Sequence, residues 1–300
     1  MERDIKLALL GGDARQGYLA AALSARGYEC AVWGLGREMG IGGAVRCGDW
    51  RDAVRGADAV ILPLPASSDG LNINCQYGNE DDKLKIVTLL NFVEAPVFGG
   101  RFDESVTSFA VAHKKRVIDY FDSESLRIRN AEPTAEGAVS IAMQKMSRTV
   151  RGCRAAVVGY GRIGKMLAHL LARIGAEVTV AARNCGQLAE AASFGYRTLK
   201  ISENAPRRGL DKILRREGCD VIFNTVPSRI FDSEVLNATD EGILFVDLAS
   251  VPGGVDFASA KSKCIDAVRA LSLPGKYAPE SAGNIIADVL DELFESEGVT

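Results

Sequence analysis

Histidine is scarce in this sequence of 300 residues, which contains only His113 and His169. With only two histidines, the chain has too few from which to form a histidine-based metal centre or a catalytic triad, so we expect neither. The seven cysteines lie singly along the chain, without a Cys-x-x-Cys pair. Such an odd, dispersed set is typical of unpaired thiols in a reducing cytoplasm rather than of a disulfide framework or a zinc site.

Long apolar runs and a strong excess of one charge are missing as well. No apolar run approaches the roughly 18 residues that a transmembrane helix needs. The N-terminus leads directly into an apolar strand over residues 5–10, which predicts that there is no signal peptide. The formal net charge is only −3. We therefore expect a cytoplasmic protein without a nucleic-acid or membrane partner.

A glycine-rich turn between an apolar strand and an amphipathic helix is the strongest positive signal. Residues 155–158 are apolar, residues 165–173 are amphipathic, and residues 177–182 form a second apolar run. In this context Gly-x-Gly-x-x-Gly predicts a dinucleotide-binding turn, with the pyrophosphate at the N-terminus of the helix. The cofactor-binding residues predicted here are Gly159, Tyr160, Gly161, Arg162, Ile163 and Gly164.

The end of the second strand predicts which dinucleotide binds. NAD-binding turns are usually followed, about 20 residues on, by an acidic residue that binds the ribose 2′-hydroxyl. This sequence has Arg183 and Asn184 there, and an arginine suits the 2′-phosphate of NADP. The alternative is that Arg183 is only a solvated charge. Two later strand ends complete the predicted NADP site with Asn224, Thr225, Val226, Pro227 and Ala249.

The sequence divides into two α/β halves. Residues 1–132 predict a flavodoxin-like N-terminal substrate domain, and residues 151–279 predict a doubly wound Rossmann domain that binds NADP. A helix over residues 133–150 should connect the two domains, and a C-terminal helix over residues 280–300 should return to the first. The predicted fold is α/β, with two domains and a cleft between them.

The first strand ends in a turn that departs from the glycine pattern. Asp13, Arg15 and Gln16 follow Gly11 and Gly12, and the two charged residues stand where a pyrophosphate needs small ones. We interpret them as a polar cluster at the edge of the sheet where open α/β folds bind ligands. The alternative is an ion pair between Asp13 and Arg15 that only stiffens the loop.

Residues 133–137 predict the start of the connecting helix, because Pro133 disfavours helix before it and Thr134 is a suitable N-cap. Glu136 in the first turn is the best-placed carboxylate for proton transfer, although it is nearly as well explained by the helix dipole. Ser250 follows a later strand and should lie near the nicotinamide. The candidate catalytic residues are Asp13, Arg15, Gln16, Thr134, Glu136 and Ser250.

Several of these stretches closely resemble the family of the dipicolinate synthase A subunit. They are residues 11–16, 133–137, 159–164, 224–228, 247–256 and 273–275, in order over nearly the whole chain. The resemblance implies NADP-dependent oxidation of dihydrodipicolinate to dipicolinate, pyridine-2,6-dicarboxylate, in the mother cell of a sporulating bacterium. It also implies that the partner is the flavoprotein-like B subunit, and we keep a homodimer open. Residues 70–110 resemble the family least.

The residues agree with that chemistry. Aromatising a dihydropyridine removes a hydride and a proton, so positioning a dianionic substrate matters more than acid–base groups. Arg15 is the first candidate for binding a substrate carboxylate. Two alternatives stay open: another NADP-dependent oxidoreductase of a small carboxylated imine, and a non-catalytic regulatory subunit that binds the nucleotide.

Overall fold

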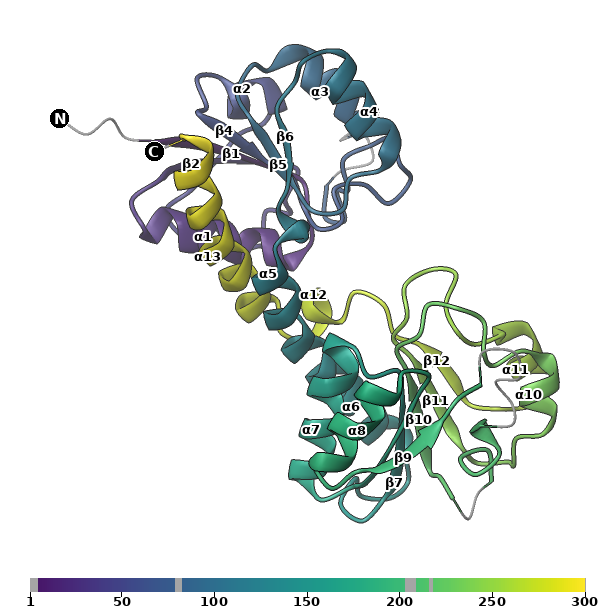
Figure 1. Cartoon of the computed structure of the whole chain (residues 1–300). Helices are drawn as coiled ribbons and strands as arrows, with labels where there is room; N and C mark the ends of the chain where they lie inside the picture. The colour runs from purple at the N-terminus through teal and green to yellow at the C-terminus, as the bar shows by residue number, and fades with distance from the viewer. Residues whose placement is uncertain (1–4, 79–82, 203–208, 216–217, 300) are drawn as a thin grey trace. The chain divides into compact units, whose positions relative to one another are not determined.

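The computed structural model describes residues 5–78, 83–202, 209–215 and 218–299. The chain divides into two compact units, one of Met1–Asn130 with Pro274–Thr300 and one of Ala131–Leu273. Within the described residues, each unit contains one six-stranded parallel sheet (Figure 1). The predicted two-domain α/β fold is confirmed.

The first unit has the strand order β3-β2-β1-β4-β5-β6. Its strands are β1 (Lys6–Leu10), β2 (Glu29–Trp33), β3 (Val45–Arg46), β4 (Ala59–Ile61), β5 (Val97–Gly99) and β6 (Val117–Asp119). Five of them follow the flavodoxin-like order, but β3 pairs with β2 and extends it to the Rossmann order. The prediction of a flavodoxin-like sheet is corrected here. Strand β3 has only two residues, after a glycine-rich loop, and two residues show no alternation of apolar and polar side chains from which a strand could be predicted.

The C-terminal helix belongs to the core of the first unit. The helices of this unit are α1 (Ala14–Ala25), α2 (Trp50–Val54), α3 (Ile86–Phe92), α4 (Glu104–Ala112), α5 (Glu124–Arg129) and α13 (Pro279–Glu297), with the 3-10 turn η1 (Tyr120–Asp122). Gly283 of α13 lies against α1, since a Cβ there would stand 2.8 Å from the carbonyl oxygen of Arg15. Arg26, which follows α1, forms ion pairs with Asp288 and Asp291 of α13.

The second unit has the order β12-β11-β10-β7-β8-β9, which is also the doubly wound Rossmann order. Its strands are β7 (Arg154–Val158), β8 (Glu177–Ala182), β9 (Arg197–Lys200), β10 (Val221–Asn224), β11 (Leu244–Asp247) and β12 (Ala267–Arg269). Its helices include α6 (Ala131–Lys145), α7 (Arg162–Ile174), α8 (Cys185–Ser193), α10 (Ser233–Asn237) and α11 (Phe257–Ser262). The short α12 (Leu273–Tyr277) crosses the boundary between the two units.

Helix α6 begins earlier than the sequence predicts. It starts at Ala131 and ends at Lys145, so Pro133 lies in its first turn and Thr134 is inside the helix rather than its N-cap. The N-cap prediction is wrong because a helix tolerates proline in its first turn. The backbone N–H groups of that turn have no helical acceptors, so a proline there removes no hydrogen bond and does not have to precede the helix. The helix falls entirely within the second unit.

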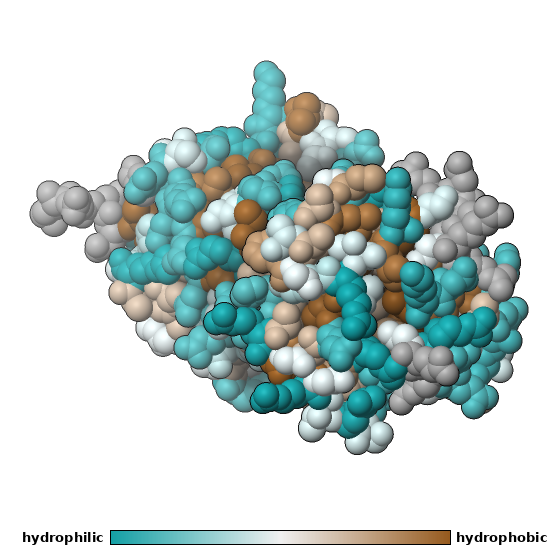
Figure 2. Space-filling model, turned by 60° about the horizontal axis from the view of Figure 1, so that its bottom comes forward, coloured by the Kyte–Doolittle hydropathy of each residue, from teal (hydrophilic) through white to brown (hydrophobic). Residues whose placement is uncertain are grey.

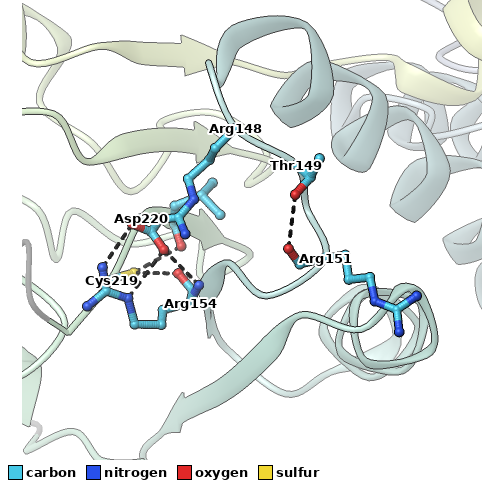
Figure 3. A network of polar contacts seen from close by, with 7 residues as sticks. Arg148, Thr149, Arg151, Arg154, Cys219 and Asp220 are labelled. Carbon is cyan, nitrogen blue, oxygen red and sulfur yellow. Dashed lines mark hydrogen bonds and ion pairs between the residues drawn. The ribbon is translucent and has the colours of Figure 1, made fainter.

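A buried carboxylate joins the start of two central strands of the second unit. The side chain of Asp220, which precedes β10, is 1% exposed, and its Oδ2 accepts a hydrogen bond of 2.8 Å from the backbone N–H of Arg154 (Figure 3). Its Oδ1 accepts from the guanidinium groups of Arg148, at 2.9 Å, and of Arg154, at 3.0 Å. Burial alone would raise the pKa of Asp220, but these hydrogen bonds and charges outweigh it and lower the pKa below its usual value.

We expect the Asp220→Ala variant to lose about 2–3 kcal/mol of unfolding free energy at neutral pH, because two arginines lose a buried partner. Since the folded-state pKa is lowered, the contribution is present above the unfolded-state pKa, near 4, and is lost as the pH falls through the folded-state value. Urea unfolding at pH 7 and pH 3 measures this. Equal losses at both pH values would contradict it.

The surface in Figure 2 has apolar residues interspersed with hydrophilic ones. Large exposed apolar side chains such as Val111, in α4, and Val251, in the turn after β11, are ordinary on the surface of a folded chain. None of the helices in the described ranges is both long enough and apolar enough to span a membrane.

Candidate nucleotide-binding and carboxylate-binding sites

Two glycines of the turn after β7 are required by the chain itself. Gly159 has a φ of +94°, and a Cβ there would stand 2.3 Å from Oγ1 of Thr225. A Cβ on Gly164 would stand 2.1 Å from the carbonyl oxygen of Gly159. These two positions therefore hold α7 and β10 close to the turn, whether or not a ligand is bound.

Gly161 is different, because nothing in the described chain requires a glycine there. It is exposed, has an extended φ of −85°, and a Cβ added to it would meet no atom within 4 Å. It is also the N-cap of α7, whose first backbone N–H groups have no helical partners. An open space in front of a helix N-terminus is what a pyrophosphate needs.

The remaining residues of the turn differ in what they can offer a ligand. The side chain of Tyr160 is 3% exposed and packs in the core, where burial raises its pKa, so only its backbone lies along the turn. Arg162 is exposed, and Ile163 is half-buried against the same core.

The ends of β10 and β11 are joined by a buried polar network. Asn224 is 1% exposed; its Nδ2 donates to Oδ1 of Asp247 at 2.8 Å, and its Oδ1 accepts from the backbone N–H of Val226. Asp247 also accepts from the backbone N–H groups of Ala249 and Gly254. The Asn224 side chain thus shapes the loop and does not point to solvent, whereas Thr225 and Val226 are half-buried and Pro227 is exposed.

Asp247 is a residue that the sequence pattern did not assign to the site. It holds the loop over residues 248–255, in which Ala249 is buried and Ser250 is exposed. Gly254 has to be glycine, since a Cβ there would stand 2.0 Å from Nδ2 of Asn224. The sequence signal was the family resemblance of residues 247–256, which does not reveal that the carboxylate is buried.

Arg183 lies where the sequence predicts, directly after β8. It lines a pocket of about 490 Å³ together with Lys200, Ile201 and Ser202 from the end of β9. Asn184 beside it caps α8, because its Oδ1 accepts hydrogen bonds from the backbone N–H groups of Gly186 and Gln187. The pocket therefore belongs to the carboxyl edge of the second sheet.

The polar cluster after β1 is an ordered, buried ion pair. The side chains of Arg15 and Asp13 are 7% and 14% exposed, with Nη2 of Arg15 2.6 Å from Oδ2 of Asp13. Nε of Arg15 donates to Oδ1 of Asp13 at 2.9 Å, and Nη2 also donates to the carbonyl oxygen of Leu64. Gln16 is buried and its Nε2 donates to the carbonyl oxygen of Ile61 at 3.4 Å.

A segment of the loop between β4 and α3 covers the first glycine turn. The backbone N–H of Gly12 donates to the carbonyl oxygen of Asn74 at 2.7 Å, and that of Gln76 donates to the carbonyl oxygen of Gly12 at 3.1 Å. A Cβ on Gly11 would stand 2.7 Å from both Asn74 O and Cys75 Sγ. The chain itself therefore fills the place where a Rossmann turn would take a pyrophosphate.

Residues 273–275, one of the stretches that carry the family resemblance, lie beside the ion pair between Asp13 and Arg15. Gly275 of α12 lies against the ion pair, since a Cβ there would stand 2.6 Å from Oδ2 of Asp13 and 3.0 Å from Nε of Arg15. On the other unit, Thr134 is buried in α6 and Glu136 is exposed on it. Asp13, Arg15 and Gln16 are thus brought together in the first unit, and the turn, Asn224–Pro227, Ala249 and Ser250 in the second.

Comparison with known proteins shows the family of the chain. A family model described as the N-terminal domain of the dipicolinate synthase A subunit matches residues 6–121. The dipicolinate synthase A subunit of Bacillus subtilis (strain 168) is 32% identical over 295 residues, covering 97% of this chain and 96% of that protein. Its crystal structure matches with a TM-score of 0.82 and 31% identity, covering 99% of this chain and 97% of that one.

Two further structures complete the comparison. The dipicolinate synthase A subunit from Bacillus halodurans has a TM-score of 0.84 and 28% identity, covering 96% of this chain and 97% of that one. A transhydrogenase from Sinorhizobium meliloti has a TM-score of 0.69 at 17% identity, covering 98% and 93%, and shares the fold. The fold defines a two-domain α/β protein with one parallel sheet of Rossmann order in each unit, and the second unit carries the glycine turn. Within that class, the chain belongs to the dipicolinate synthase A subunit family.

Proposed function

We propose that this chain oxidises dihydrodipicolinate to dipicolinate with NADP⁺ during spore formation, acting together with a flavoprotein-like B subunit. The observation that carries the proposal is the open turn at Gly161, in a member of the dipicolinate synthase A subunit family. The balanced reaction takes one hydride and one proton from the ring, giving dipicolinate, NADPH and H⁺.

The residues of the second unit fit a dinucleotide. The exposed Gly161 leaves space at the N-terminus of α7 for the pyrophosphate, and Arg183 supplies a cation at the end of β8 for the 2′-phosphate. Ala249, whose backbone N–H donates to Asp247, and the adjacent Ser250 are assigned to the nicotinamide end. When bound, NADP⁺ supplies the acceptor for the hydride.

The first unit supplies the carboxylate-binding group. Arg15 is held by Asp13 and by the carbonyl oxygen of Leu64, so its guanidinium is fixed before a substrate arrives. A fixed guanidinium binds a carboxylate with little further loss of side-chain entropy. Glu136, exposed on α6, is assigned as the proton acceptor.

The test is a turnover assay of the chain with the B subunit. Dihydrodipicolinate and NADP⁺ should give NADPH, followed by its absorbance, and dipicolinate, identified by chromatography, in equal amounts. Turnover of other carboxylated imines but not of dihydrodipicolinate would favour a different oxidoreductase. NADPH binding without any turnover, alone or with the B subunit, would favour a regulatory role.

Cofactor preference gives a separate prediction. Replacing Arg183 with alanine should weaken NADPH binding by about tenfold, because a charge-assisted contact with the 2′-phosphate is lost, and should leave NADH binding nearly unchanged. Fluorescence titration of both reduced dinucleotides measures this. Equal losses for the two cofactors would overturn the assignment of Arg183 to the 2′-phosphate.

A further inference from the structure

The pocket beside Arg183 contains a second cation, contributed by a different strand. Lys200 is the last residue of β9 and is exposed, and it lies in register with Ala182, which immediately precedes Arg183. The backbone N–H of Ile201 donates to the carbonyl oxygen of Ala182 at 2.9 Å. This bond fixes the ends of β8 and β9 side by side, so the two basic residues line one pocket.

Burial alternates along residues 200–202, and this alternation places the hydroxyl group of Ser202 at the same pocket. Ile201 is 4% exposed and packs in the core of the unit, whereas Lys200 and Ser202 on either side of it are exposed. Successive side chains of an extended segment point to opposite sides, so Lys200 and Ser202 share the side away from that core. Among the described residues, Lys200 forms no ion pair with a carboxylate.

We propose that Lys200 and Ser202 bind the 2′-phosphate of the adenosine half of NADP(H), opposite Arg183, and so determine the choice of dinucleotide. The inference rests on the proposed function for the presence of a dinucleotide and deepens it by assigning residues outside the glycine turn. A phosphate dianion offers three acceptor oxygens, and two cations with one hydroxyl match its charge and its hydrogen-bonding capacity. A ribose 2′-hydroxyl uses neither cation, so the pocket discriminates between the two dinucleotides.

The test compares Lys200→Met with Arg197→Met in the full chain. Methionine keeps most of the length of lysine but removes its charge. Arg197 stands at the other end of β9, where it pairs with Glu177 at 3.3 Å, and serves as the matched control for a lost positive charge. The probes are NADPH and NADH by fluorescence titration, and adenosine 2′,5′-bisphosphate and adenosine 5′-monophosphate by calorimetry.

Lys200→Met should weaken NADPH and adenosine 2′,5′-bisphosphate by about fivefold to tenfold, with NADH and adenosine 5′-monophosphate changed by less than about twofold. Ser202→Ala should give a smaller loss in the same direction, and Arg197→Met should give none. If Lys200→Met has the same ratio of NADPH to NADH affinity as the wild type, this inference is overturned. The proposed function still stands in that case, provided that the wild type prefers NADPH. A wild-type chain that binds neither dinucleotide overturns both.

Discussion

Replacing Gly161 with valine is expected to abolish NADPH binding and to leave the second unit folded. The added side chain would enter the space at the N-terminus of α7, where its Cβ has no atom within 4 Å apart from its chain neighbours. It would stand in the place proposed for the pyrophosphate. We expect affinity to fall at least about a hundredfold, which corresponds to about 2.7 kcal/mol. The exchange of an N-cap glycine for valine should cost less than about 1 kcal/mol of stability. Fluorescence titration and thermal unfolding measure the two effects.

The neighbouring glycines provide the matched controls. Valine at Gly159 would stand against Thr225 from a backbone with positive φ, and valine at Gly164 would overlap the carbonyl oxygen of Gly159. Both variants should therefore lower the melting temperature sharply, as strained backbone and overpacking do. If Gly161→Val binds NADPH as tightly as the wild type, the turn is only a structural feature of the βαβ unit.

The parts of the fold that could be predicted from the sequence are those with a local signal. The apolar runs of β1 and β7 and the glycine spacing after β7 are contiguous in the sequence, and the structure has a strand or a turn at each. The start of α6 was misplaced because a proline in a first turn has the same sequence appearance as one before the helix.

The parts that could not be predicted depend on residues far apart in the chain. The buried hydrogen bonds of Asp247 depend on the pairing of β10 with β11, which brings Nδ2 of Asn224 to 2.8 Å from Oδ1 of Asp247. Lys200 becomes a pocket residue only through the register of β9 on β8. The role of Gly275 requires the last segment to return to the first unit, against Asp13. No local periodicity carries this information.

Arg15→Ala is expected to reduce kcat/KM for dihydrodipicolinate by about ten- to a hundredfold, since a charge-assisted contact with a carboxylate contributes about 1.5–3 kcal/mol. NADPH affinity should barely change, because the proposed nucleotide-binding residues belong to the other unit. The assay includes the B subunit, and NADPH binding is titrated separately. Normal turnover, or lost NADPH binding in a folded variant, would show that Arg15 has another role.

The same substitution also removes an ion pair, so stability has to be separated from function. Arg26→Ala is the matched control, because Arg26 follows the same helix α1 at its other end and pairs with Asp288 and Asp291 of α13. Both variants should lower the melting temperature, and only Arg15→Ala should lower kcat/KM. If Arg15 merely stiffens its loop through Asp13, the two variants will differ little in kcat/KM. Arg15→Lys keeps the charge beside Asp13 and should then recover part of the stability without a kinetic deficit, whereas a carboxylate site that uses the guanidinium geometry should remain impaired with lysine.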